Sequence, residues 1–211
     1  MSNWQKDKTS LDILEFNYAT LSKEHYKWFK QACKKAKIKN IQENNKLAGH
    51  IKEEYALDRP PDDIIRMLIN MVDKRFFKYL DTIRTLTKNL PFDLADVWCN
   101  FQKKHEFNPY HDHGGVYSFV VWLRIPYEHA EQNNLPFLQG VKEQDRKAGM
   151  FEFQYYDIFG RTTHHGYRLG KDVEGVMLFF PAMFKHTVYP FYNTDETRVS
   201  VSGNLWLRPH V

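Results

Sequence analysis

Residues 108–123 read NPYHDHGGVYSFVVWL, a polar segment that leads directly into a run of large apolar side chains. The polar part carries two histidines, His111 and His113. In an extended chain, residues two apart share a face, so both imidazoles can point to one place at the start of a buried strand. The segment therefore predicts a β-strand that carries a pair of chemically active imidazoles at its start.

Further strand-like runs on both sides of this segment make the second half of the chain a β-domain. From Ala95 onward the apolar period changes from 3.6 to 2, and such runs occupy residues 97–101, 116–125, 149–155, 175–180 and 198–207. The alternation of strands and helices that builds a parallel sheet is not visible there. We therefore expect an α+β protein with an antiparallel double-stranded β-helix core, the jelly-roll or cupin-like arrangement.

The first third of the chain predicts helices that brace this core. Ser22 can cap a helix whose apolar residues recur at three- and four-residue steps. A second apolar stripe runs from Ile64 to Leu86 and predicts one long helix of about six turns. We expect one domain over residues 1–211, with residues 1–94 as mainly helical support and residues 95–211 as the jelly-roll core. The polar residues 128–147 predict a long loop.

Composition narrows the class of protein. The chain has 211 residues and a formal net charge of +4, and it contains no run of roughly 18 to 20 apolar residues, so we expect no membrane segment. No apolar run follows the charged N-terminus, and the two cysteines, Cys33 and Cys99, lack disulfide or metal spacing, so we expect a cytoplasmic protein. The lysines between Lys23 and Lys52 look like solvated helix faces, which makes nucleic acid a less favoured partner.

A third histidine lies far from the first two in the sequence. Residues 175–191 read GVMLFFPAMFKHTVYPF, a buried strand that ends at a proline turn and returns one histidine, His186. Imidazole nitrogens are common ligands of divalent transition metals. We therefore expect His111, His113 and His186 to be metal ligands if the fold brings the two segments together.

The last strand offers an anion site. In residues 198–207, the polar residues Arg198, Ser200, Ser202 and Asn204 alternate with apolar ones. The polar face could be exposed to solvent, or it could point into a cavity while the apolar face lies under the helices. In the second case Arg198 and Ser200 would suit a carboxylate, because the planar guanidinium forms paired hydrogen bonds.

Residues 97–207 together resemble the iron(II)/2-oxoglutarate oxygenases, in particular the prolyl-hydroxylase-like branch and small phage-encoded members. The resemblance rests on His111 at the start of a jelly-roll strand, the distal His186, and an Arg-x-Ser at Arg198 and Ser200. It implies that the histidines bind Fe(II), and that Arg198 and Ser200 bind the distal carboxylate of the co-substrate 2-oxoglutarate.

One position departs from the family pattern. Family members place an acid two residues after the first histidine, and this chain has His113 there. Either His113 replaces the carboxylate, or Asp112 reaches the metal through a distorted backbone. Strand alternation favours His113, because it sends Asp112 to the opposite face.

The resemblance implies a dioxygenase that hydroxylates a C–H bond, such as that of a peptidyl proline or another protein side chain, and releases succinate and carbon dioxide. It leaves the partner open between a protein or peptide and a smaller substrate. Two other classes remain: a cupin-like metalloprotein that does not use 2-oxoglutarate, and a jelly-roll binding module without enzymatic activity. Binding of 2-oxoglutarate separates the first of these from the oxygenase.

Overall fold

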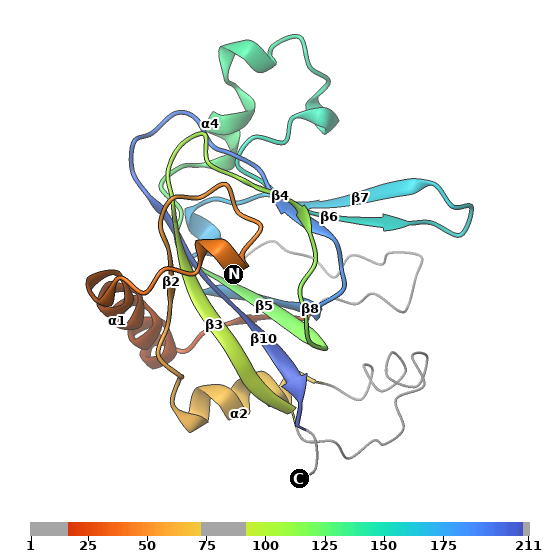
Figure 1. Cartoon of the computed structure of the whole chain (residues 1–211). Coiled ribbons are helices and arrows are strands. Elements are labelled where there is room, and N and C mark those ends of the chain that lie inside the picture. Colours follow the sequence, from red (N-terminus) through yellow and green to blue (C-terminus); the bar gives the residue numbers. More distant parts are fainter. Residues whose placement is uncertain (1–16, 73–91, 209–211) are drawn as a thin grey trace.

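A computed structural model describes residues 17–72 and 92–208, which form two facing antiparallel sheets (Figure 1). The larger sheet has six strands in the order β1 (Asn17–Thr20), β8 (Val176–Pro181), β5 (Tyr117–Arg124), β10 (Arg198–Leu207), β3 (Phe92–Gln102) and β2 (Glu54–Ala56). The smaller sheet has four strands in the order β4 (Asn108–His111), β9 (His186–Val188), β6 (Phe151–Tyr156) and β7 (Thr162–Tyr167). This is a jelly-roll arrangement, as expected.

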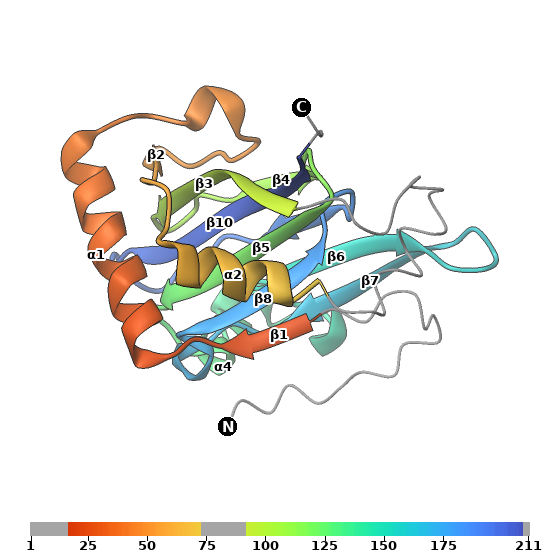
Figure 2. The same cartoon turned by 90° about the horizontal axis from the view of Figure 1, so that it is seen from below.

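Two helices cover the outer face of the larger sheet (Figure 2). They are α1 (Lys23–Lys39) and α2 (Asp62–Asn70). Helix α1 begins as expected at Ser22, whose Oγ accepts a hydrogen bond of 3.1 Å from the backbone N–H of His25. It ends at Asn40, which adopts the left-handed conformation with a φ of 55°.

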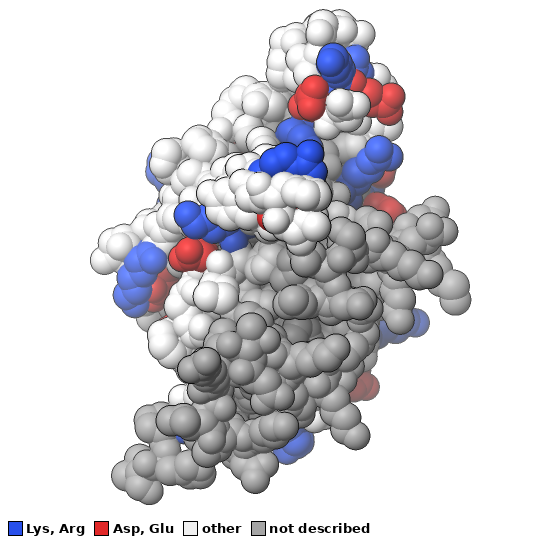
Figure 3. Space-filling model, turned by 90° about the vertical axis from the view of Figure 1, so that its right-hand side faces the viewer, with Lys and Arg blue, Asp and Glu red and all other residues white. Residues whose placement is uncertain are grey.

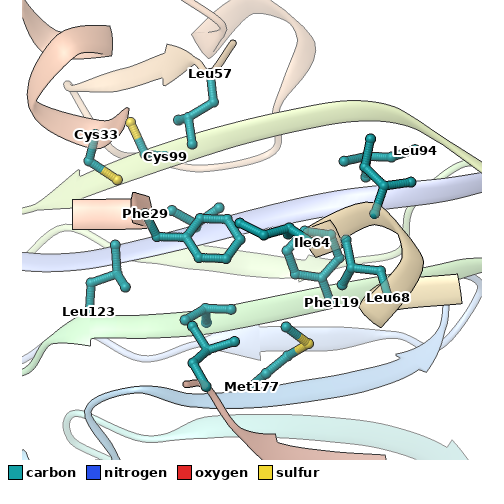
Figure 4. Packing of buried hydrophobic residues seen from close by; sticks show 14 of the residues in the cluster. Phe29, Cys33, Leu57, Ile64, Leu68, Leu94, Cys99, Phe119, Leu123 and Met177 are labelled. Carbon is teal, nitrogen blue, oxygen red and sulfur yellow. The ribbon is translucent and has the colours of Figure 1, made fainter. Parts of the chain in front are cut away.

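The helices and the sheet enclose one apolar core (Figure 4). Phe29 of α1 and Ile64 and Leu68 of α2 are fully buried against it. From the sheet, Phe119 and Val201 join the same cluster. Burying a side chain of this size stabilises the fold by about 1.5 to 3 kcal/mol, so this core fixes the sheet that carries β10 and β3.

A second apolar cluster lies between the two sheets. Trp122 and Phe180 of the larger sheet pack there with Phe151 and Phe153 of the smaller one. The ring centroids of Phe153 and Phe180 are 5.0 Å apart in an edge arrangement. The cluster sets the spacing between the sheets, and His186 lies at its border, with its ring stacked on Phe151 at 5.3 Å.

Several elements of the N-terminal part differ from the expectation. Helix α2 ends at Asn70, so the apolar stripe from Ile64 to Leu86 is not one continuous helix. The rest of that stripe, in residues 73–91, lies outside the described residues. The short strands β1 and β2 were not predicted, because strands of 4 and 3 residues are too short to show a period of their own.

The polar segment 128–147 also has more structure than a plain loop. It contains the short helix α4 (His129–Asn133), which begins with a capping box between Glu128 and Glu131. Three-residue 3-10 helices follow at Pro136–Leu138 and Glu143–Asp145, and others lie at Asn44–Lys46 and Lys171–Val173. The segment projects away from the sheets at the top of Figure 1.

Other expectations concern the surface and the cysteines. Among the described helices, none is long and apolar enough to cross a membrane. Cys33 and Cys99 are both buried free thiols. On the face drawn in Figure 3, basic and acidic side chains are interspersed over the described residues.

Candidate metal centre

Strand pairing in the smaller sheet brings the distant histidines together. His111 at the end of β4 is directly opposite His186 at the start of β9. His113 follows two residues after His111, and its backbone N–H donates to the carbonyl of Ala182 at 2.9 Å. One ring nitrogen from each of the three histidines lies within 4.8 Å of the others. The predicted His-x-His and the distant His186 therefore form one cluster.

Backbone carbonyls orient two of the rings. The Nδ1 atom of His111 is 2.7 Å from the carbonyl oxygen of Pro109, and that of His186 is 2.8 Å from the carbonyl oxygen of Phe184. A carbonyl only accepts, so Nδ1 carries the proton in both rings and Nε2 keeps its lone pair. Metal-binding histidines are typically held in this way.

The third ring completes the cluster. The Nε2 atom of His113 lies 3.2 Å from the Nε2 atom of His186. The indole of Trp98 lies beside the His113 ring, with centroids 5.4 Å apart. Trp98 on one side and Phe151 on the other shield the imidazoles, so the cluster has an apolar border.

Burial keeps all three imidazoles neutral. It lowers the pKa of His111, it lowers the pKa of His113 to about 3, and it lowers the pKa of His186 well below its ordinary value. The charges of the neighbouring histidines lower the pKa of His113 and His186 further. At neutral pH His111 and His186 therefore offer the lone pairs of their Nε2 atoms to a divalent transition metal, and no charged imidazolium has to lose its proton first.

Asp112 does not join this cluster. Its side chain is exposed, and its carboxylate oxygens do not lie with the three histidine nitrogens that are within 4.8 Å of one another. This follows from strand alternation, which turns residue 112 away from the face that carries His111 and His113. His164, another histidine outside the predicted set, is exposed, and its Nδ1 lies 3.1 Å from a carboxylate oxygen of Glu152.

Arg198 lies on the inner face of β10, with a relative exposure of 2%. All five N–H groups of its guanidinium have a protein acceptor. Nε and one Nη donate to Oε1 of Gln102, the first of these at 3.2 Å. The remaining N–H groups donate to the hydroxyl of Tyr127 and to the carbonyls of Gly149 and Tyr189, the two carbonyls at 3.3 and 3.2 Å. These contacts join β10 to β3 and to two loops, and the anion-binding role that the sequence predicted for Arg198 stays a prediction.

Ser200 lies one step along the same face. Its Oγ accepts a long hydrogen bond of 3.4 Å from the side-chain amide of Asn100 on β3. Apolar Val199 and Val201 point to the opposite side, into the core under the helices. The inward direction of the polar face of β10 therefore agrees with the second of the two alternatives derived from the sequence.

Sequence reasoning missed the polar residues that β3 and β2 place on the inner face of the sheet, beside β10. In the register of the sheet, Gln102 pairs with Arg198 and Asn100 with Ser200. The alternation of Trp98, Asn100 and Gln102 in the sequence could have revealed this inward polar row. Glu54 on β2 lies next to Asn100 on β3. No alternation in the sequence could have revealed Glu54, because β2 is only 3 residues long.

Comparisons with known proteins agree on the fold. A family profile described as "Putative 2OG-Fe(II) oxygenase" matches residues 96–204, just over half of the chain. A solved prolyl-4-hydroxylase from Pseudomonas putida is 12% identical, with a TM-score of 0.54, over 92% of this chain and 93% of that one. No curated protein sequence matches the chain significantly.

Two further solved structures are less similar in shape. A prolyl hydroxylase from Trichoplax adhaerens, in complex with a peptide fragment of hypoxia inducible factor, has 12% identity and a TM-score of 0.46, over 91% of this chain and 82% of that one. HygX from Streptomyces hygroscopicus, with nickel and 2-oxoglutarate bound, has 12% identity and a TM-score of 0.47, over 93% and 83% of the two chains.

Proposed function

Because the chain belongs to the 2OG-Fe(II) oxygenase family, we propose that it hydroxylates a C–H bond of its substrate and converts 2-oxoglutarate to succinate and carbon dioxide. Family membership makes the chain an iron(II)- and 2-oxoglutarate-dependent enzyme. The observation that carries the proposal is the group of three imidazole nitrogens within 4.8 Å of one another in a jelly roll. The reaction and the substrate class are the proposed part.

In this proposal, His111, His113 and His186 hold the iron. Their neutral rings and the fixed Nδ1 hydrogen bonds of His111 and His186 support this assignment. Three neutral ligands leave the full charge of the metal in place, whereas a carboxylate would reduce it by one. The centre would therefore attract a dianionic co-substrate strongly. When bound, the iron with 2-oxoglutarate and oxygen supplies the oxidant for the C–H bond.

Arg198 and Ser200 bind the distal carboxylate of 2-oxoglutarate in the same proposal. The guanidinium is buried and faces inward, which suits recognition of a carboxylate in a protected cavity. The carboxylate would have to replace acceptors that the guanidinium now has, and the side chains of Gln102 and Tyr127 are the ones able to rotate away. Binding therefore includes a local rearrangement around Arg198.

A protein side chain, such as a peptidyl proline, is the proposed substrate, as in the prolyl-4-hydroxylase that shares this fold. The chemistry requires a C–H bond presented to the open side of the metal. We also propose a cytoplasmic location, which the two free buried thiols support.

The decisive experiment is anaerobic addition of iron(II) and 2-oxoglutarate to the apoprotein, followed by visible spectroscopy. We expect the weak metal-to-ligand charge-transfer band of the chelated co-substrate. His186→Ala should abolish the band, and Arg198→Ala should raise the concentration of 2-oxoglutarate needed for it. His164→Ala is the matched control, because it removes an exposed histidine of the same sheet and should leave the band unchanged.

Two results would contradict the proposal. Iron binding without a band would mean that 2-oxoglutarate does not chelate the metal. A band that persists in His186→Ala would mean that the cluster is not the metal site. With the band established, a proline-containing peptide should gain the mass of one oxygen atom while succinate is formed.

A further inference from the structure

A second set of buried polar atoms lies outside the histidine cluster. Among the described residues, Oε1 of Glu54, Oδ1 of Asn100 and Oδ1 of Asn108 have no hydrogen-bond donor. The side chains are nine-tenths buried or more, since the residues are 0%, 7% and 9% exposed. A buried acceptor without a donor costs about 1 to 3 kcal/mol, so three of them need an explanation.

The three residues share one region of the fold. Glu54 on β2 is the register partner of Asn100 on β3. Their neighbours Tyr55 and Cys99 pack in the core under the helices, so Glu54 and Asn100 point to the inner face. On that face Asn100 is next to Trp98, whose ring contacts His113. The oxygens therefore lie on the same side of the sheet as the histidine cluster.

Gly49 shows that two of these oxygens face a common point. A Cβ atom on Gly49 would lie 2.6 Å from Oε1 of Glu54 and 3.1 Å from Oδ1 of Asn108. The bridge between His50 and Phe107 holds this part of the chain next to the start of β4. Gly49 is itself partly exposed, so the two oxygens lie against a residue that reaches the surface.

The chemistry of the set is that of a cation acceptor. One of the three groups is a carboxyl, and its other oxygen already accepts a hydrogen bond of 3.2 Å from the side-chain amide of Asn44. Burial, together with the charge of Glu106, raises the pKa of Glu54 to about 7. A bound cation would offset both effects, because it would supply the missing opposite charge.

A primary ammonium group fits this set better than other donors do. It carries one positive charge, three N–H donors and no acceptor, which matches one carboxyl and two amide oxygens. A hydroxyl offers one donor and no charge, and a quaternary ammonium offers charge but no donor.

We propose that Glu54, Asn100 and Asn108 form a binding site for a primary ammonium group beside the metal centre. This site rests on the geometry alone. That the ammonium group belongs to the oxygenase substrate rests in addition on the proposed function. The group can come from a lysyl side chain of a protein or from a free small amine.

The binding test uses n-butylammonium as the probe and the full chain loaded with iron(II) and 2-oxoglutarate without oxygen. Isothermal titration calorimetry should show binding, with 1-butanol and tetramethylammonium at least about tenfold weaker. Glu54→Gln keeps the shape of the side chain and removes its charge, and Gly49→Ala places a methyl group against two of the oxygens. Each should raise the dissociation constant at least about tenfold.

Controls separate this inference from the oxygenase proposal. The charge-transfer band and the melting temperature of each variant report whether the metal site and the fold are intact. A normal band, with n-butylammonium affinity equal in wild type and Glu54→Gln, would overturn the ammonium site and leave the oxygenase proposal standing. Absence of the band, together with amine binding that Glu54→Gln weakens, would overturn the oxygenase proposal and leave the ammonium site standing.

The source of the amine is tested by turnover. A lysine-containing peptide, the same peptide with acetylated lysine, and free n-butylamine are compared for succinate formation above the rate without substrate. Stimulation by the lysine peptide and not by its acetylated form identifies a protein source. Stimulation by n-butylamine alone identifies a small amine. Equal stimulation by both forms of the peptide would overturn the assignment of the site to the substrate.

Discussion

The Nε2 atoms of His113 and His186 lie 3.2 Å apart, although 73 positions separate these residues in the sequence. Both rings are neutral, because burial lowers their pKa values far below neutral pH. The Nδ1 proton of His186 is held by the carbonyl of Phe184, so its Nε2 presents a lone pair to His113. The neutral ring of His113 can donate its Nε2–H to this lone pair, and a metal ion bound by both nitrogens would replace that single hydrogen bond with two ligand bonds.

Metal removal should therefore lower the stability of the protein. A ligand that binds only the folded state at about 100 times its dissociation constant stabilises it by about 2.7 kcal/mol. For a chain of this size that corresponds to a rise in melting temperature of roughly 5 to 10 °C. Calorimetry with and without a chelator measures the difference. His186→Ala should abolish it, and equal melting temperatures for apoprotein and metal-loaded protein would contradict a metal site here.

Replacing His113 by a carboxylate should test the departure from the family pattern. We expect His113→Asp to retain iron, because an aspartate oxygen is also a good ligand, and to bind 2-oxoglutarate more weakly, because the centre loses one positive charge. Asp112→Ala should change neither affinity, since the side chain is exposed. Titration of the charge-transfer band gives both constants. Loss of iron in Asp112→Ala would show that this residue, and not His113, is the ligand.

Much of the β-domain follows from the sequence. Strand β10 has the predicted bounds, Arg198 to Leu207, because polar and apolar residues alternate along nearly all of it. The histidine cluster was also predictable, since His111 and His113 share a face and His186 follows a proline turn. These features depend on local pattern and on a few antiparallel pairings.

Other features depend on tertiary contacts that no local pattern reveals. The partners of Arg198 include the backbone carbonyls of Gly149 and Tyr189. Every residue has such a carbonyl, so the sequence does not reveal which ones accept a hydrogen bond from Arg198. Strand β2 exists because β3 provides a partner for it, so the burial of Glu54 could not be foreseen. Helix α2 ends at Asn70 without the glycine or proline that usually indicates a helix end in a sequence.

Arg198→Ala should destabilise the fold as well as weaken 2-oxoglutarate binding. The guanidinium satisfies the side chains of Gln102 and Tyr127 and two carbonyls, and its removal leaves buried acceptors without donors. We expect a loss on the order of 3 kcal/mol in urea unfolding. Ser200→Ala should cost under about 1 kcal/mol, because Ser200 makes only one long hydrogen bond of 3.4 Å. Equal losses in both variants would argue against a structural role of the guanidinium.

Gly115→Ala should disturb the connection between the His-x-His segment and β5. Gly115 has a φ of +94°, and a Cβ atom there would lie 2.8 Å from the carbonyl oxygen of Leu205. Gly160→Ala is the matched control, because Gly160 has a φ of +74° with nothing within 4 Å of its Cβ position. The control should cost about 1 to 2 kcal/mol from backbone strain alone, and Gly115→Ala should cost more. Chemical denaturation compares them, and equal costs would mean that the contact with Leu205 relaxes freely.

Glu54 should make the stability fall as the pH rises. Burial and the charge of Glu106 raise its pKa in the folded state from 4.5 to about 7. The folded state therefore holds this proton more tightly than the unfolded state does. The associated stability is fully present below pH 4.5 and is lost as the pH rises through about 7, and it amounts to about 3 kcal/mol.

Adjacent Glu53 provides a control of opposite sign. Hydrogen bonds from Lys37 and Lys103 lower its pKa, so its contribution is lost as the pH falls. Urea unfolding between pH 4.5 and 8.5 should show the gap between wild type and Glu54→Gln shifting in favour of the variant as the pH rises. Glu53→Gln should show no such shift above pH 6. A constant difference between wild type and Glu54→Gln across this range would mean that Glu54 is ionised throughout, with a cation or donor already beside it.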